Sequence, residues 1–95
     1  MKTIHKYPVT GLFDEQLIET HEGAKFLCVH YQGSTPTLWA EVDTDMPECK
    51  RCVFIVGTGN PLPEEPCDYV GTLPMMKDQL IWHYYVAKMH EGYNG

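Results

Sequence analysis

Turn-forming residues interrupt this chain about every ten residues, and that spacing constrains its fold more than any other feature of the sequence. Glycine, proline and aspartate separate short apolar runs, and no longer window keeps the period of a helix. The pattern predicts an all-β protein, a small antiparallel sandwich or barrel of about six to seven strands. The strands are expected at residues 3–9, 16–20, 25–32, 37–43, 50–56, 67–73 and 79–86.

Residues 14–21 leave one alternative open. Asp14 is a good N-cap residue, and a short helix starting from it fits the sequence as far as His21. The shorter strand at residues 16–20 competes with that helix. The alternative fold class is therefore α+β with one short helix.

Alternating side chains assign the faces of the expected strands. In residues 37–43, Leu38, Ala40 and Val42 are expected to face the core, and the residues between them to face outward. Pro8 lies near the end of the first strand and has no N–H group for a ladder hydrogen bond. Its position indicates that this strand lies at the edge of a sheet.

Two expected strands, residues 25–32 and 79–86, are apolar on both faces. In the first, strict alternation places Phe26 on one face and Val29 on the other. A chain of this size has few elements with which to cover both faces of a sheet. Either the strands fold over into two layers, or one face meets a second copy of the chain, so a homo-oligomer is an open expectation.

Composition bounds the class of protein. The 95 residues, 43% of them hydrophobic, suffice for one domain whose core needs no metal or disulfide. This domain is expected to span residues 1–86, followed by a flexible tail at residues 87–95. Thirteen acidic and seven basic residues give a net charge of −6, which disfavours direct binding of nucleic acid.

The apolar runs also bear on location. None approaches the roughly 18 residues that a membrane-spanning helix needs, so no membrane partner is expected. The first residues, MKTIHKYPVTG, contain no apolar signal segment. A cytoplasmic location is therefore expected, in which the four cysteines remain reduced thiols.

The segment VFIVGTGNPLP, residues 53–63, contains the first candidate site. A buried strand ends there in a loop, and Gly57, Thr58, Gly59 and Asn60 offer successive backbone N–H groups that can form an anion-binding nest. The loop lacks the lysine of a P-loop and the helix of a dinucleotide fingerprint. A turn whose glycines serve geometry alone is the alternative. A weaker copy of the Val-Gly-Thr sequence follows at residues 70–72.

A nucleotide bound at this loop needs side chains for stacking and for phosphate contacts. The candidates for that role are Arg51, Trp39, Trp82 and Tyr84, provided that the fold brings them near the loop. No cofactor is expected.

Cysteines and histidines offer other chemistry. Cys49 and Cys52 have the spacing of half a metal site, but no second such pair completes four ligands, so no metal is expected. His30 and His83 lie in expected strands and would face each other if those strands paired. Either histidine is a candidate general base, but no residue is assigned as catalytic. A non-enzymatic protein is therefore expected, with a small enzyme as an alternative.

Six landmarks recur in a known order: MKTIHKYPV at the start, EGAKFLCVHYQ (22–32), PTLWAEVD (36–43), VGTGNPLP (56–63), YVGT (69–72) and WHYYV (82–86). In their order and spacing the chain resembles a family of small uncharacterised proteins of phages and of bacteria that carry phage genes. The CKRC segment at residues 49–52 and the extension at residues 88–95 depart from that family's features. The resemblance implies a phage context and a host cytoplasm, and it implies no established activity.

These observations favour a non-enzymatic, phage-encoded binding module that acts on a host factor, for example as an inhibitor of a host defence protein. An apolar and acidic surface would block that host protein. The alternatives are a protein that sequesters a small nucleotide signal at the glycine loop and a small enzyme.

Overall fold

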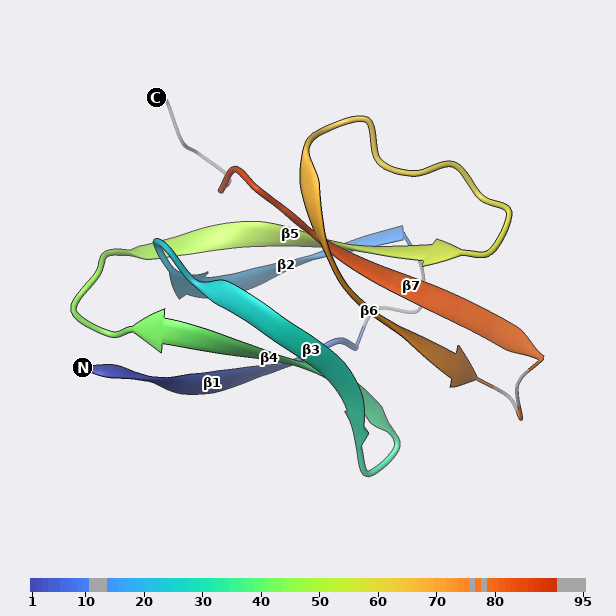
Figure 1. The fold of residues 1–95 in the computed structure, drawn as a ribbon, viewed down its shortest axis with the longest axis horizontal. Coiled ribbons are helices and arrows are strands. Elements are labelled where there is room, and N and C mark those ends of the chain that lie inside the picture. Colours follow the sequence, from blue (N-terminus) through green and yellow to red (C-terminus); the bar gives the residue numbers. More distant parts are fainter. Residues whose placement is uncertain (11–13, 76, 78, 91–95) are drawn as a thin grey trace.

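The computed structural model describes residues 1–10, 14–75, 77 and 79–90 of the chain. These residues form seven β-strands, and they contain no helix that could span a membrane (Figure 1). Each strand lies where the sequence predicts one, so the all-β prediction is confirmed. The strands are β1 (Lys2–Pro8), β2 (Asp14–His21), β3 (Lys25–Gln32), β4 (Thr35–Asp43), β5 (Glu48–Gly57), β6 (Cys67–Met75) and β7 (Leu80–Ala87).

Residues 14–21, for which the sequence allows a strand or a short helix, form the strand β2. Each of its residues has an antiparallel partner in β5. Ile18 and Thr20 are buried, whereas Leu17 and Glu19 are exposed. This two-residue period buries one face of a strand against the opposite sheet. The helical alternative is wrong, because a helix would not keep that period.

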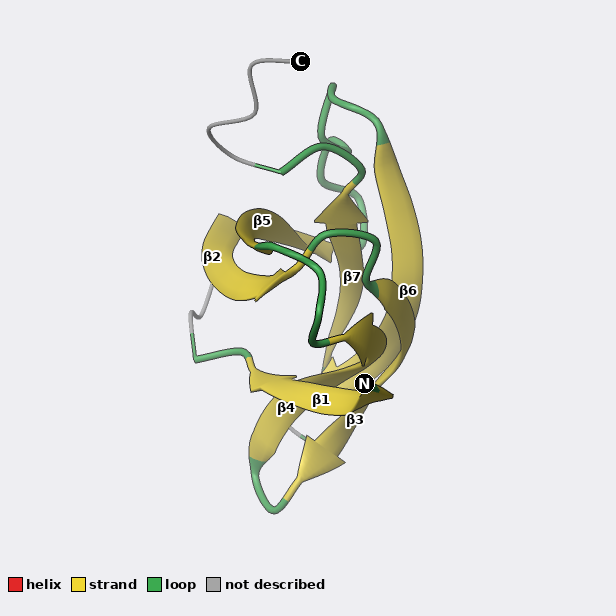
Figure 2. Ribbon diagram, turned by 90° about the vertical axis from the view of Figure 1, so that its left-hand side faces the viewer, coloured by secondary structure: helices red, strands yellow, loops and turns green. Residues whose placement is uncertain are grey.

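The strands form two antiparallel sheets. One sheet has the order β1-β4-β3, and the other has the order β2-β5-β7-β6. In Figure 2 the three-stranded sheet lies below the four-stranded sheet, so the molecule has two layers. Because each sheet keeps its own edge strands, the arrangement is a sandwich and not a closed barrel.

The core lies between the inner faces of the two sheets. Tyr84 and Val86 from β7 pack there against Leu38 from β4, and each of the three is at most 1% exposed. Ala40 and Val42 are also buried, which confirms the predicted inward face of β4. Burial raises the pKa of the Tyr84 phenol to about 12, so this hydroxyl stays protonated at neutral pH.

A β-bulge changes the faces of β3. Phe26 and Cys28 lie opposite consecutive residues of β4, so Leu27 is the extra residue of the bulge. Beyond the bulge the two faces exchange, and both Phe26 and Val29 contact the core. The strict alternation predicted for residues 25–32 is therefore wrong at this point.

The sandwich is closed along one side, where β3 meets β6. Gly71 lies so close to β3 that a Cβ atom at this position would be 2.7 Å from Val29 Cγ1. The Tyr31 hydroxyl donates a hydrogen bond of 2.6 Å to the Pro74 carbonyl. These contacts join the edge strands of different sheets, and the approach at Gly71 requires a residue without a side chain.

Along the other side, β1 and β2 face each other without sharing a ladder. Side chains fill the space between them. The Tyr7 and Thr20 hydroxyls are 2.7 Å apart, and the His5 and His21 ring centroids are 5.9 Å apart. Pro8 belongs to β1, at the edge of its sheet, so the predicted edge position is confirmed.

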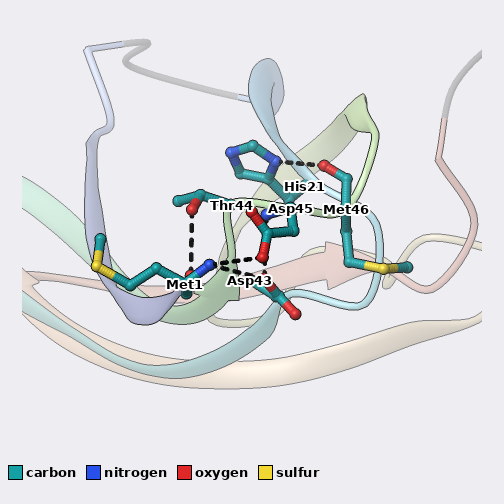
Figure 3. A network of polar contacts seen from close by, with 6 residues as sticks. All are labelled: Met1, His21, Asp43, Thr44, Asp45 and Met46. Atoms are coloured by element: carbon teal, nitrogen blue, oxygen red, sulfur yellow. Dashed lines mark hydrogen bonds and ion pairs between the residues drawn. The ribbon is translucent and has the colours of Figure 1, made fainter.

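A polar network ties the start of β1 to the connection between β4 and β5 (Figure 3). The Met1 ammonium lies 3.3 Å from the Asp43 carboxylate and 3.0 Å from that of Asp45. His21 joins β2 to the network through a 2.9 Å hydrogen bond to the Met46 carbonyl. Since a carbonyl only accepts, this bond requires the proton on Nδ1 of His21.

The chain beyond β7 is anchored where the structure describes it. Ala87 is 1% exposed and belongs to β7. The Lys88 amide donates to the Pro66 carbonyl at 2.9 Å, and its ammonium lies 2.7 Å from the Asp68 carboxylate. Residues 91–95, the main part of the predicted tail, lie outside the described residues.

Candidate functional site

β5 ends in a tight turn that begins at Gly57. The Asn60 amide donates to the Gly57 carbonyl at 3.0 Å, and Gly59 has a φ of +93°, which is the geometry of a type II turn. The Thr58 amide donates to the Ile81 carbonyl at 3.4 Å. Two of the N–H groups predicted to form an anion nest are thus bonded within the protein.

The two Val-Gly-Thr sequences meet at one histidine. Thr58 Oγ1 lies 2.8 Å from His83 Nε2, and Thr72 Oγ1 lies 2.9 Å from His83 Nδ1. This follows from the sheet order, because β7 lies between β5 and β6 and pairs His83 with Val56 on one side and with Thr72 on the other. The repeated sequence therefore places a hydroxyl on each side of one imidazole.

Two tyrosines extend this cluster. The Tyr69 hydroxyl lies 2.5 Å from Thr72 Oγ1, and its ring meets the ring of Tyr85 edge-on, with centroids 5.4 Å apart. Tyr69 is 57% exposed, so the cluster opens to solvent. The cluster is named here the Tyr69–His83 surface, and its members are Thr58, Tyr69, Thr72, His83 and Tyr85.

A second β-bulge makes this surface possible. Tyr69 and Thr72 are three residues apart, and in a regular strand they would point to opposite faces. The register of β6 shifts between Tyr69 and Gly71, so Tyr69 lies opposite Tyr85 and Thr72 opposite His83. Both side chains therefore share the outer face of the four-stranded sheet.

The hydroxyls fix the orientation of His83. A hydroxyl can both donate and accept, so Thr58 and Thr72 can satisfy either neutral tautomer of the imidazole. If Nδ1 accepts from Thr72, then Nε2 donates to Thr58, and the Tyr69 hydroxyl donates to Thr72. Both ring nitrogens have partners in the protein. The arrangement is thus an oriented surface of aromatic rings and hydroxyls.

A shallow groove of about 400 Å³ adjoins this surface, because Val56, one of its lining residues, is the strand partner of His83. Phe54 and the loop residue Leu62 also line it, and Leu62 is 59% exposed. Among the described residues the lining contains one carboxylate, that of Glu15, and no basic side chain. The groove therefore suits an apolar or cationic group better than a phosphate.

A larger hollow of about 530 Å³ lies over the three-stranded sheet. Lys2 and Lys25 line it together with Glu41 and Asp43, so its charges are mixed in sign. No aromatic side chain is among the described residues that line it. It offers fewer directional contacts than the Tyr69–His83 surface.

The predicted tryptophan ligands lie apart. Trp82 is the register partner of Gly57, and a Cβ atom on Gly57 would be 3.2 Å from the indole ring. The Trp82 Nε1 is buried and has no hydrogen-bond partner among the described residues, so this side chain fills space beside the loop. Trp39 lies in the other sheet, where the Lys6 ammonium is 6.0 Å from its ring centroid. The fold thus brings Trp82, and not Trp39, to the loop. The prediction for Tyr84 is wrong, because this side chain is buried in the core and cannot stack on a ligand.

Arg51 lies in the first half of β5, away from the loop, and is 8% exposed. Its Nε and Nη2 donate to the Ala87 carbonyl at 2.9 and 2.6 Å, and its Nη1 donates to the Ala24 carbonyl at 3.1 Å. Its guanidinium lies 5.3 Å from the Phe26 ring centroid. Burial lowers the pKa of Arg51. Its donors tie the end of β7 to the turn before β3, and they point to no phosphate position at the loop.

Cys49 and Cys52 occupy opposite faces of β5, because they are three residues apart on a strand. Burial raises the pKa of the Cys49 thiol, which keeps it protonated at neutral pH. Cys52 is buried, with its sulfur 3.8 Å from a Glu15 carboxylate oxygen. In the part of the chain that the structure describes, no three His, Cys, Asp or Glu side chains are placed to hold a metal ion.

His30 and His83 do not face each other. β3 and β7 belong to different sheets, so the strand pairing that such a site requires is absent from the described sheets. His30 is exposed and lies opposite Thr37 in β4. Of the two histidines, His83 is the one that belongs to a cluster.

The sequence alone does not identify Tyr69, Thr72 or Tyr85 as members of a site. The available signal is the second Val-Gly-Thr sequence at residues 70–72. Its meaning depends on the sheet order β5-β7-β6 and on the bulge in β6, which place Tyr69 and Thr72 on one face.

Comparison with known proteins supplies a family. No curated protein and no solved structure matches the chain. The family described as "Domain of unknown function (DUF7352)" matches residues 1–94. This agrees with the resemblance to an uncharacterised family, and it adds no activity. With nearly its whole length matched, the chain belongs to the DUF7352 family.

Proposed function

We propose that this protein is a non-enzymatic binding module that binds a host protein through the Tyr69–His83 surface. The observation that carries the proposal is the exposure of Tyr69, a large aromatic side chain held in place by Thr72 and Tyr85. Tyrosine is enriched at protein interfaces because it combines a large contact area with a polar group. A side chain that is ordered before binding loses less conformational entropy when a partner arrives.

The charges around the surface indicate the chemistry of the partner. Glu64 and Glu65 are exposed in the loop before β6, and Asp68 adjoins Tyr69. Asp68 is paired with Lys88, but the chain as a whole has a net charge of −6. An aromatic centre with an acidic surround suits a host surface with a neutral centre and a basic rim.

Sequestration of a nucleotide at the glycine loop has less support. The Thr58 and Asn60 amides already donate to backbone carbonyls. Arg51 is buried, and the adjoining groove presents the carboxylate of Glu15. A phosphate at this loop would meet a negative charge without a neighbouring cation to offset it. These contacts favour the protein partner over the nucleotide.

The phage origin belongs to this proposal, and it is supported by the six sequence landmarks. In its specific form the proposal is a phage-encoded inhibitor of a host defence protein, acting in the host cytoplasm. The argument for that form is one of context, because family and fold alone do not determine function.

The test is an affinity measurement with a purified host protein. The tagged chain is used to isolate its partner from a host extract, and the purified partner is then titrated by calorimetry. We expect Tyr69→Ala to weaken binding at least tenfold, about 1.4 kcal/mol, because truncation of an interface tyrosine removes both contact area and a polar group. Tyr69→Phe, which keeps the ring, should lose less.

Leu27→Ala is the matched control, since Leu27 is also apolar and 41% exposed but belongs to the other sheet. This variant should bind as the original chain does. An equal loss in both alanine variants would contradict the assignment of the surface. If instead no host protein is retained and a nucleotide raises the melting temperature, the sequestering function replaces this one.

A further inference from the structure

We propose that the binding interface extends from the Tyr69–His83 surface across the four-stranded sheet into the adjoining groove, where the host protein places an arginine side chain against the carboxylate of Glu15. This inference rests on the proposed function, because it takes a host protein as the partner and names the group that this partner contributes. It starts from the order of the side chains on the outer face of the sheet, which leads from Tyr69 to the groove.

A row of four side chains crosses that face, one from each strand of the sheet. Glu15 in β2 is the register partner of Phe54 in β5, and Phe54 is in turn the register partner of Tyr85 in β7. Tyr85 is the register partner of Tyr69 in β6. The sequence neighbours of Phe54 and Tyr85 pack in the core, so these two rings face outward. The row therefore joins three aromatic rings to one carboxylate.

The groove lies at the Glu15 end of this row. Glu15 and Phe54 line it from the sheet, and the loop that follows β5 lines it with Pro61, Leu62 and Pro63 (Figure 1). Most of the described residues around it have apolar side chains. Its volume of about 400 Å³ lies within the range of roughly 300–1,000 Å³ that is usual for sites holding small organic groups. The groove is therefore large enough for one long side chain of a partner.

The charge of Glu15 is available to a cation from outside the chain. Glu15 is exposed, and the ion pairs among the described residues involve other carboxylates. The Cys52 sulfur lies 3.8 Å from its carboxylate oxygen, but a thiol is only a weak donor. Glu19, on the same face of β2, differs because it lies opposite Lys50. Of these two carboxylates, Glu15 is the one beside the groove.

An arginine side chain fits the apolar wall, the aromatic ring and the carboxylate together. Its methylene groups cover apolar surface while its charged end stays polar. Its planar guanidinium stacks on aromatic rings, and its fork of N–H groups matches the two oxygens of a carboxylate. A lysine ammonium has the charge without the plane and the fork. An apolar side chain would cover the Glu15 carboxylate without giving it a hydrogen bond.

One partner can contact both ends of the row. Adjacent strands are about 4.8 Å apart, so Glu15 in β2 and Tyr69 in β6 are separated by three such spacings, or about 14 Å. An ordinary interface covers about 800 Å² on each protein, which is wide enough for both. Tyr69 then provides the aromatic anchor, and Glu15 binds a cation of the basic rim expected for the partner.

A small probe tests the groove on the full chain without a host protein. The probe is acetyl-arginine methylamide, and acetyl-citrulline methylamide is its uncharged isostere. In a nuclear magnetic resonance titration, we expect the arginine probe to shift the amide signals of residues 54–56 and to bind about threefold more tightly than the citrulline probe. Glu15→Gln should abolish this preference. The control Glu19→Gln removes the same charge from the same face of β2, outside the groove, and should keep it.

The purified host protein provides the second measurement. Glu15→Gln should weaken its binding about fivefold, whereas Glu19→Gln should bind within about twofold of the original chain. Circular dichroism confirms that each variant is folded. The absence of an arginine preference, a preference that survives Glu15→Gln, or host binding unchanged by Glu15→Gln would each overturn the inference. Tyr69→Ala separates the two proposals: if it abolishes host binding while Glu15→Gln does not, the inference fails alone, and if host binding survives it, the proposed function fails.

Discussion

Arg51 shows how a single residue joins parts of the chain that are far apart in sequence. Three of its nitrogens donate to the carbonyls of Ala24 and Ala87, and its guanidinium lies over Phe26. Such a cation is costly to bury unless its donors are satisfied. Here its donors bond to two carbonyls of buried residues at the end of the sandwich.

Removal of this side chain should therefore destabilise the fold. We expect Arg51→Ala to lower the free energy of unfolding by about 2–4 kcal/mol, because two buried carbonyls lose their donors. The free energy of unfolding of Arg51→Lys should lie between those of the original chain and Arg51→Ala, since an ammonium lacks the planar fork that reaches both carbonyls. Urea unfolding monitored by tryptophan fluorescence measures this. A loss below about 1 kcal/mol in Arg51→Ala would contradict the structural role.

Asp43 gives a prediction about pH. The backbone N–H of Asp45 and the Met1 ammonium lower the pKa of Asp43 below its ordinary value of 3.8. A carboxyl group whose pKa is lower in the folded state stabilises the fold above its unfolded pKa, and that contribution is lost as the pH falls through the folded pKa. Asp43→Asn, which keeps an acceptor but no charge, should be less stable at pH 7.

The difference between Asp43→Asn and the original chain should shrink below a pH of about 4 and disappear in stronger acid. Unfolding midpoints measured across this range check it. A difference that stays constant from neutral to acidic pH would mean that the charge of Asp43 does not contribute.

At the scale of elements, the sequence predicts the strands better than it predicts which side chains share a face. Seven strands, the edge position of Pro8 and the inward face of β4 follow from turn spacing and alternation. The bulges at Leu27 in β3 and after Tyr69 in β6 do not, because they depend on the register with a neighbouring strand.

The candidate site shows the same division. The glycine loop and Trp82 are predicted to lie together, and they do. The prediction uses only the backbone amide of Thr58, whereas in the structure its hydroxyl also forms a hydrogen bond with His83. Arg51 lies in the first half of β5, away from the loop at the end of that strand. Trp39 belongs to the other sheet, and the sequence does not reveal that arrangement. Tyr69 requires both the order β5-β7-β6 and the bulge in β6 to reach the same face as His83.

The junction of β3 with β6 gives a prediction at this scale. Gly71→Ala should destabilise the fold by about 1–3 kcal/mol, because the new methyl group would lie 2.7 Å from Val29 Cγ1 where both strands are held by their sheets. Chemical unfolding of the single and double variants measures it. In the background of Val29→Ala, the cost of Gly71→Ala should fall, because the clashing methyl is gone. An equal cost in both backgrounds would assign the effect to the backbone and not to the contact.

At the scale of the whole molecule, the Tyr69–His83 surface lies on the outer face of the four-stranded sheet, on β5, β6 and β7. The three-stranded sheet contributes no residue to it.

The binding surface itself is tested most directly by hydrogen–deuterium exchange of the chain, alone and in complex with the isolated host protein. We expect slower exchange on binding in residues 57–72 and 81–85, which contain the members of the Tyr69–His83 surface, and unchanged exchange in residues 25–32. Protection confined to residues 25–43 of the three-stranded sheet, with residues 57–72 unchanged, would contradict it.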